Sequence, residues 1–82
     1  MRLLRVKPGH GEVLLAEGDV QVPEQHAELL HAFRSELDAG MWAAVPTSSA
    51  AGRREAELVR SFEEVPPSAE RVIFFPRAAG GS

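Results

Sequence analysis

The stretch that decides the fold is residues 71–75, RVIFF, which is followed by Pro76 and by the segment RAAGGS at positions 77–82. The β-branched and aromatic side chains of RVIFF favour a strand, and the run is too short for a helix. Because the run is almost wholly apolar, we expect a central strand, buried on one face and partly on the other. Pro76 should stop the strand, since it has no N–H to donate to a neighbour.

Upstream of this strand lies the clearest helical pattern in the chain. Pro23 suits the first helical position, where a missing N–H costs nothing, and Gly40 suits the left-handed residue that ends a helix. The expected helix is about 16 residues long. Its predicted apolar stripe consists of Ala27, Leu30, Phe33, Leu37 and Met41, and its predicted polar side of Gln25, Glu28, Arg34, Ser35 and Asp38. A helix with one apolar stripe needs a partner layer, and a sheet is the expected one.

The N-terminal part of the chain predicts a hairpin. Residues 3–6 and 12–16 are the two strands, with Val13 and Leu15 on one face and Leu14 on the other. The intervening KPGH, residues 7–10, suits a type II turn, because Pro8 presets its own φ and Gly9 accepts a positive one.

The segment after Gly40 is less regular. We expect a strand over residues 41–45 that Pro46 closes, and a surface loop over the small polar residues 47–54. Residues 57–62 predict either a short strand with Leu58 and Phe62 inward or a helical turn. Residues 65–68, VPPS, should interrupt regular structure.

Composition limits the function classes. The chain has 82 residues, enough for one domain with one modest core, and 44% of them are hydrophobic. The net charge of −3 gives no reason to expect nucleic acid or an anionic membrane as a partner. With no cysteine, disulfides and thiolate chemistry are excluded, which fits a cytoplasmic protein. We see no signal peptide and no apolar run long enough to cross a bilayer.

The order hairpin, helix, strand, weak strand and strong strand resembles the β-grasp fold of ubiquitin. RVIFFPRAAGG, residues 71–81, looks like the last strand and diglycine tail of ubiquitin-like modifiers and sulfur carriers. EQHAELLHAFRSELDAG, residues 24–40, also resembles the helix of small bacterial ubiquitin-like proteins. The resemblance implies an α+β fold with a mixed sheet of four to five strands on one helix. It divides the chain into a domain, residues 1–77, and a flexible tail, residues 78–82.

The same resemblance implies a function through the tail. Such proteins are joined through a C-terminal glycine, here Gly81 after Gly80, to AMP and then to a cysteine of an activating enzyme. Two terminal glycines have no side chains to block the narrow channel that leads to the nucleotide. The implied partners are an activating enzyme that uses ATP, a conjugating enzyme, a processing peptidase and covalently modified target proteins. The chain itself would be no enzyme and would hold no cofactor; one setting the resemblance suggests is a bacterial anti-phage pathway.

Ser82 bears on this interpretation. If Gly81 carries the reactive carboxylate, Ser82 must first be removed, as happens to the extensions of many ubiquitin-like precursors. The other interpretation is that Ser82 was added for expression. Two further functions stay open: a sulfur carrier with a C-terminal thiocarboxylate, and a β-grasp interaction module whose glycines are only a flexible end.

Several residues are candidates for contact with the activating enzyme. Leu14 and either Ile73 or Phe75 should point away from the helix and form an exposed apolar patch. Arg77 lies at the base of the tail and suits an acidic partner.

Two residues that occur once each have other candidate roles. Trp42, the sole tryptophan, either covers an edge of the helix–sheet core or anchors a partner. Lys7, the sole lysine, is with the N-terminus the only amine at which one copy could be linked to another.

The remaining polar groups carry little chemistry. His26 and His31 are five residues apart, which turns them away from each other on a helix, and His10 adds no sensible spacing for a metal. Closely spaced like charges are typical of solvent-exposed polar segments. We interpret in this way the acidic pairs Glu55/Glu57 and Glu63/Glu64 and the basic pair Arg53/Arg54. Ser48 and Ser49 lack the glycine-flanked turn of a serine hydrolase. We therefore expect no catalytic and no metal site.

Overall fold

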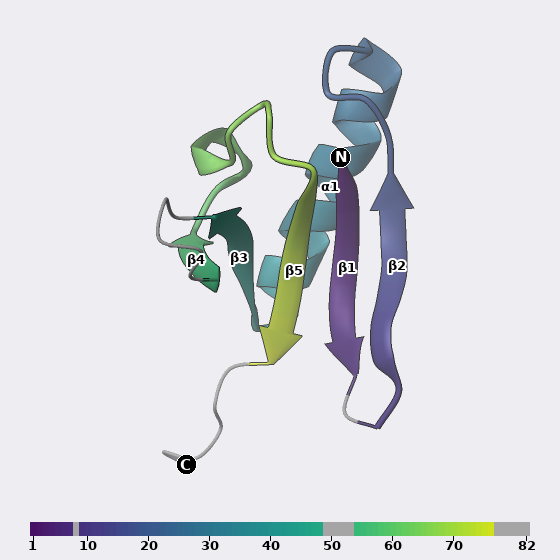
Figure 1. Ribbon diagram of the computed structural model, residues 1–82. Helices are drawn as coiled ribbons and strands as arrows, with labels where there is room; N and C mark the ends of the chain where they lie inside the picture. The colour runs from purple at the N-terminus through teal and green to yellow at the C-terminus, as the bar shows by residue number, and fades with distance from the viewer. Residues whose placement is uncertain (8, 49–53, 77–82) are drawn as a thin grey trace.

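The computed structural model describes residues 1–7, 9–48 and 54–76, in which a five-stranded mixed sheet packs on one α-helix (Figure 1). The elements in chain order are β1 (Arg2–Lys7), β2 (Gly11–Glu17), α1 (Pro23–Asp38), β3 (Met41–Ser48), β4 (Arg54–Val59), the 3₁₀ turn η1 (Phe62–Glu64) and β5 (Arg71–Pro76). The strands lie in the order β2-β1-β5-β3-β4. The α+β class and the mixed sheet on one helix are confirmed.

The strand predicted from RVIFF is β5, and it occupies the centre of the sheet. It pairs parallel with β1 and antiparallel with β3, whereas the pairs β1–β2 and β3–β4 are antiparallel. Val72 and Phe74 are fully buried, while Ile73 and Phe75 between and after them are half-buried. The expectation of a strand buried on one face and partly on the other is confirmed. Pro76 is the last residue of the strand.

The hairpin is confirmed, with an irregularity that the sequence did not reveal. Gly9 has φ 81°, and the N–H of His10 donates to the carbonyl of Lys7 at 2.9 Å, as the predicted turn requires; Pro8 lies outside the described residues. Leu3 pairs with Ala16 but Leu4 pairs with Leu14, so the register skips Leu15. The simple alternation of faces predicted for residues 13–15 therefore does not hold through the strand.

The helix begins at Pro23 and has the predicted 16 residues. Gly40 has φ 90°, and its N–H donates to the carbonyl of Leu37 at 3.0 Å, so the predicted left-handed end is confirmed. The predicted apolar stripe is rotated: Leu29, which it omitted, is fully buried, whereas Ala27, which it included, is exposed. The centre of the buried face runs through Leu29, Phe33 and Glu36.

The second hairpin is longer than predicted. β3 continues through Pro46 to Ser48, and β4 begins at Arg54, so the predicted loop over residues 47–54 was wrong at both ends; residues 49–53 lie outside the described part of the chain. β5 pairs with β3 only as far as Ala44. Beyond that point β3 has one neighbour, so a proline without an N–H is tolerated there.

The faces of β4 also differ from the prediction. Val59 is buried and pairs with the buried Ala43, whereas Leu58 is 51% exposed, so the inward position predicted for Leu58 was wrong. Phe62 is inward as predicted, but from the turn η1 and not from a strand. The interruption predicted for residues 65–68 is confirmed, since no helix or strand covers them.

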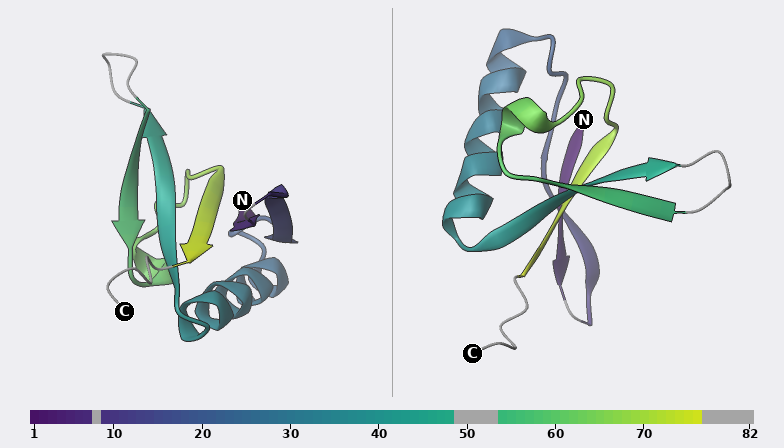
Figure 2. Two further views of the ribbon diagram at one scale, coloured as in Figure 1. Left: turned by 90° about the horizontal axis from the view of Figure 1, so that it is seen from below. Right: turned by 90° about the vertical axis from the view of Figure 1, so that its left-hand side faces the viewer.

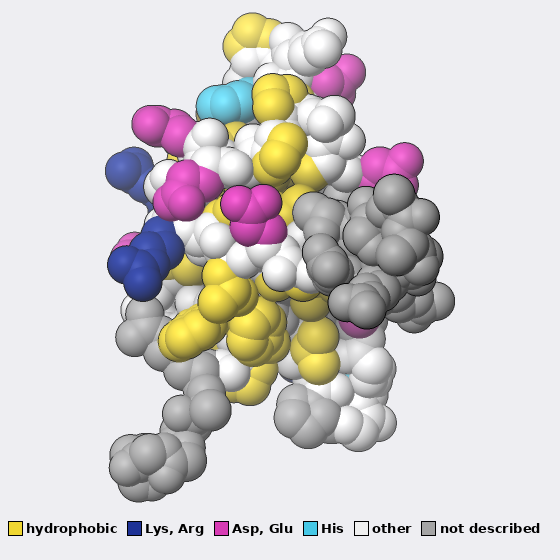
Figure 3. Space-filling model, turned by 60° about the vertical axis from the view of Figure 1, so that its left-hand side comes forward, with side chains coloured by type: hydrophobic (Ala, Val, Ile, Leu, Met, Phe, Trp, Pro, Cys, Tyr) yellow, Lys and Arg dark blue, Asp and Glu magenta, His cyan; other side chains and the backbone are white. Residues whose placement is uncertain are grey.

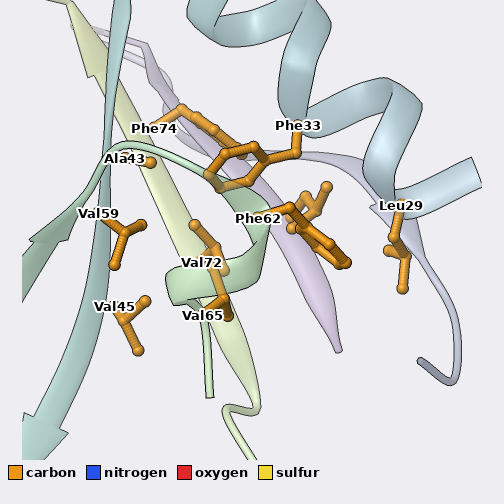
Figure 4. Close-up of a cluster of buried hydrophobic side chains, with 10 residues drawn as sticks. Leu29, Phe33, Ala43, Val45, Val59, Phe62, Val65, Val72 and Phe74 are labelled. Atoms are coloured by element: carbon orange, nitrogen blue, oxygen red, sulfur yellow. The ribbon is translucent and has the colours of Figure 1, made fainter. Parts of the chain in front are cut away.

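The core lies between the helix and one face of the sheet (Figure 2). Phe33 from α1 meets the rings of Phe62 and Phe74 edge-on, with centroids 5.5 and 5.4 Å apart, and these three aromatic residues join helix, turn and sheet (Figure 4). The buried core residues are Leu3, Leu29, Phe33, Ala43, Val45, Val59, Phe62, Val65, Val72 and Phe74. No helix among the described residues is long and apolar enough to span a membrane.

Candidate functional site

The second face of the sheet, which the helix does not cover, is also apolar. Successive side chains of a strand point to opposite faces, so residues next to buried core positions lie on the uncovered face. Leu4 follows the buried Leu3, Ile73 lies between Val72 and Phe74, and both therefore point away from the helix. We call this side of the sheet the open face.

The pairing register aligns one apolar residue from every strand across the open face. Leu14 of β2 pairs with Leu4 of β1, Leu4 with Ile73 of β5, Ile73 with Ala44 of β3, and Ala44 with Leu58 of β4. We call these five residues the open-face row. Its two ends, Leu14 and Leu58, are each 51% exposed, and no second layer covers them within the described residues.

A pair of aromatic residues lies beside the row. Trp42 pairs with Phe75 across β3 and β5, and their ring centroids are 6.2 Å apart. Trp42 is 41% exposed and neighbours the buried Ala43, so it lies on the open face and does not cover the helix–sheet core. This position favours the second of the two interpretations of Trp42, an anchor for a partner.

A shallow hollow adjoins Trp42. It has a volume of about 550 Å³ and is lined by Leu37, Met41, Trp42, Ala43, Leu58, Val59 and Arg60. Hydrophobic side chains gather on this side of the molecule (Figure 3). Six of the seven lining residues are apolar, and Arg60 supplies the one charge, so the hollow suits an apolar side chain with an acidic neighbour.

The sequence predicted part of this surface. Leu14 lies on the open face as expected, and the choice between Ile73 and Phe75 was unnecessary, because residues two apart on a strand share a face. Leu4 and Leu58 were missed. Leu4 could have been assigned to the open face, because it directly follows the core residue Leu3. The face of Leu58 depends on the register of β4, which the sequence alone does not determine.

Lys7 lies exposed at the end of β1. Because β1 and β5 are parallel, Lys7 and Pro76 lie at the same end of the sheet, as the two arrowheads in Figure 1 show. The ammonium of Met1 donates to the carbonyl of Gly18 at 2.7 Å, so Lys7 is the freer of the two candidate amines. The predicted tail residues Arg77, Gly80, Gly81 and Ser82 lie outside the described residues.

The histidines are spread over separate surfaces. His10, His26 and His31 are all exposed, and His26 lies edge-on to Phe62 with centroids 5.2 Å apart. No group of three or more His, Cys, Asp or Glu side chains suitable for a metal occurs in the described residues.

The acidic residue Glu64 has a local structural role. Its Oε1 accepts from the N–H of Arg60 at 3.2 Å and from the hydroxyl of Ser61 at 3.4 Å, which holds the chain between β4 and η1. Ser48 lies in β3, and Ser49 and Arg53 lie outside the described residues.

One ion pair fixes the helix to the sheet. Arg5 donates from Nε to Oε1 of Glu36 at 2.7 Å and from Nη2 to Oε2 at 2.6 Å. The hydrogen bond to Glu36, together with the charge of that carboxylate, raises the pKa of Arg5 above its ordinary value. No local pattern indicates this pair, since the two residues are 31 positions apart.

Comparison with protein-family models, curated proteins and solved structures finds no match for this chain.

Proposed function

We propose that this chain is a ubiquitin-like protein modifier with a β-grasp fold. The support is topological: a hairpin, one helix and a second hairpin lead to a last strand that returns to the centre of the sheet beside the first. Parallel pairing of the first and last strands, within the order β2-β1-β5-β3-β4, is the arrangement that the β-grasp resemblance implies.

The observation that carries the proposal is the position of β5. This strand is held on both sides by neighbours and runs out of the sheet at Pro76, four residues before Gly80. A glycine pair this close to the end of a central strand follows a firmly held segment of backbone, and the two glycines have no side chains. That combination suits a segment that must enter a narrow enzyme channel.

The proposed chemistry takes place at the carboxylate of Gly81, freed by a peptidase that cleaves the bond before Ser82. The carboxylate attacks the α-phosphorus of ATP and displaces pyrophosphate, which gives an acyl adenylate. A cysteine thiolate of the activating enzyme then displaces AMP, and a target amine finally displaces the thiolate to form an amide. This chain is the acyl donor, the partners supply the catalysis, and we propose the cytoplasm as the compartment.

The open face is the surface proposed for the activating enzyme. The row from Leu14 to Leu58 and the aromatic pair Trp42 and Phe75 offer apolar area that would be buried in a complex. Phe75 lies directly before Pro76, so an enzyme seated on this face would be close to the root of the tail. Arg77 would then lie inside the interface, where it would favour an acidic partner.

The experiment compares three forms of the tagged full chain in cells that make it. The proposal predicts high-mass species in wild type that survive denaturation and reduction, since an amide resists both. Gly81→Ala should remove them, because a side chain at the reactive position obstructs the channel. Ser82→Ala is the matched control and should leave them unchanged, since the same molecule forms once residue 82 is removed. Absence of such species in wild type would refute the proposal.

The other two functions predict different outcomes of the same preparation. A sulfur carrier predicts a free form that ends at Gly81 and has a mass corresponding to sulfur in place of one carboxylate oxygen. An interaction module predicts a chain that keeps Ser82 and forms no covalent product. The mass of the free protein therefore separates all three.

A further inference from the structure

The two edges of the sheet differ in how they are protected from pairing with other strands. An edge strand exposes unpaired N–H and C=O groups, and proteins commonly protect it with charged residues, proline or irregular pairing. β4, with the sequence REAELV, has charged residue types at three of its first four positions. β2, with the sequence GEVLLAE, has none between Glu12 and Glu17.

The unprotected part of β2 is also the most apolar exposed segment. Val13, Leu14 and Leu15 are 36%, 51% and 36% exposed, and they are three of the five large hydrophobic side chains that the described residues expose. Three in succession on one edge strand are unusual for a surface that meets only water. The register skip at Leu15 is the one protective irregularity along this edge.

We propose that a second copy of this chain covers this edge, with the two β2 strands paired antiparallel about a two-fold axis at Leu14. The two sheets then form one continuous sheet. This inference does not depend on the proposed function.

The charges of β2 are compatible with a second copy in this register. With the axis at Leu14, Leu14 lies opposite the partner's Leu14, Val13 lies opposite the partner's Leu15, and Glu12 lies opposite the partner's Ala16. The Leu14 pair and the two symmetric Val13–Leu15 pairs beside it are apolar, and no carboxylate faces another. A shift of the axis to between Leu14 and Leu15 would place Glu12 opposite the partner's Glu17, which repels. The strand can therefore pair with a second copy of itself in this register without opposing two carboxylates.

The proposed dimer leaves the rest of the open face free. In a continuous antiparallel sheet the axis is perpendicular to the sheet, so both open faces lie on the same side and both helices on the other. The open-face row would then continue through Leu14 into the partner. Trp42, near the other end of the row, would remain uncovered, and the two Pro76 residues would lie toward opposite ends of the joined sheet.

A single pair of strands buries less area than a standard stable interface, which covers about 1,200–2,000 Å² in total. The dimer should therefore be weak, and its population should change within an accessible range of protein concentration. Sedimentation equilibrium of the full chain over such a range measures this. Wild type should move from 8.9 kDa toward twice that mass as the concentration rises.

Substitutions at two equally exposed residues distinguish dimerisation through the β2 edge from dimerisation through the open face. Leu14→Lys adds a charge at the proposed axis and should hold the protein monomeric at every concentration. Leu58→Lys is the control, because Leu58 is also 51% exposed and ends the same row, but lies on β4; it should dimerise like wild type. Leu15→Lys gives a second test of the edge if Leu14→Lys does not fold by circular dichroism.

The possible outcomes are decisive. A wild type that stays monomeric to its solubility limit overturns the proposal and leaves the edge to a different partner. Loss of the dimer in Leu58→Lys, or its persistence in the folded edge variants, overturns it as well, since either result assigns the contact to another surface. Concentration-dependent protection of β2 amides from hydrogen exchange would support the edge pairing directly.

Discussion

Arg5 and Glu36 join the sheet to the helix through two hydrogen bonds of 2.7 and 2.6 Å. Glu36 is 8% exposed, so its carboxylate lies almost wholly within the protein, with a guanidinium as its partner. The two parallel hydrogen bonds fix both the distance and the orientation of α1 relative to β1. This pair therefore helps decide which face of the helix meets the sheet.

Removal of one partner of this pair should destabilise the fold. Arg5→Met should lower the melting temperature by several degrees, because it leaves the buried Glu36 carboxylate without its cation. The double variant Arg5→Met/Glu36→Leu should recover much of the loss, since no charge then stays buried. Thermal unfolding by circular dichroism gives the three midpoints. A double variant that is less stable than Arg5→Met would contradict this account of the pair.

The raised pKa of Arg5 gives a pH prediction with a definite sign. When folding raises the pKa of a cationic group, the group stabilises the fold fully at any pH below its pKa in the unfolded state. This stabilisation is lost only as the pH rises through the pKa in the folded state. For an arginine both values are strongly alkaline. The stability difference between wild type and Arg5→Met should therefore stay constant from neutral to mildly alkaline pH, as urea unfolding can measure. A difference that shrinks in this window would contradict the assignment.

Two neighbouring phenylalanines should differ in their effect on stability. Phe74 is fully buried against Phe33, so Phe74→Ala should lower the free energy of unfolding by about 3–5 kcal/mol. Phe75 is half-buried on the open face, so Phe75→Ala should cost clearly less. Urea unfolding followed by the fluorescence of the single Trp42 measures both. Equal losses would mean that the faces of β5 are assigned wrongly.

Gly40 should resist replacement for a conformational reason alone. Its φ is 90°, and a Cβ built at this position meets no atom within 4 Å, so the cost of a side chain comes from the backbone. Gly40→Ala should therefore destabilise the protein by about 1 kcal/mol. Gly40→Asn should cost less, because asparagine tolerates positive φ better. An alanine variant as stable as wild type would contradict this interpretation of the helix end.

Lys7 gives a prediction that rests on the proposed function. As the sole lysine, it is the expected acceptor for self-linkage, and Lys7→Arg should remove self-linked species while conjugates to other proteins persist. The arginine keeps the positive charge at this exposed position, so the fold should be unaffected. Peptide mass spectrometry of purified conjugates is the measurement. Self-linked species that persist in Lys7→Arg would count against Lys7 as the acceptor.

The parts predicted well from the sequence are those with strong local signals. Pro23 and Gly40 mark the two ends of the helix, and the apolar run of residues 71–75 gives the central strand, since the physical causes lie within a few positions. The face of a weakly patterned strand is set by its neighbours instead. Leu58 lies on the open face because it pairs with Ala44 and not with Ala43. This register cannot be predicted from the residues near Leu58 in the sequence.

The prediction for the helix stripe failed for a related reason. The predicted stripe and polar side both left out Glu36, and no local signal in the sequence marks an acidic residue as buried. In the fold Arg5 neutralises Glu36, so the helix rests on the face centred on Leu29 and Phe33. For the candidate site, Leu14 and Phe75 were predicted and Leu4 and Leu58 were not, because the row forms only once five strands are in register.

The most direct test of the central claim is to identify the bond that the modifier forms. Trypsin cleaves after Arg77, so a target lysine joined to Gly81 would keep the remnant Ala-Ala-Gly-Gly from residues 78–81. Mass spectrometry of digested high-mass species should find this remnant on lysines of other proteins in wild type and not in Gly81→Ala. The high-mass species could instead contain this chain with its C-terminal tryptic peptide always ending in Ser82, and with no remnant on any lysine. In that case the chain is not a modifier.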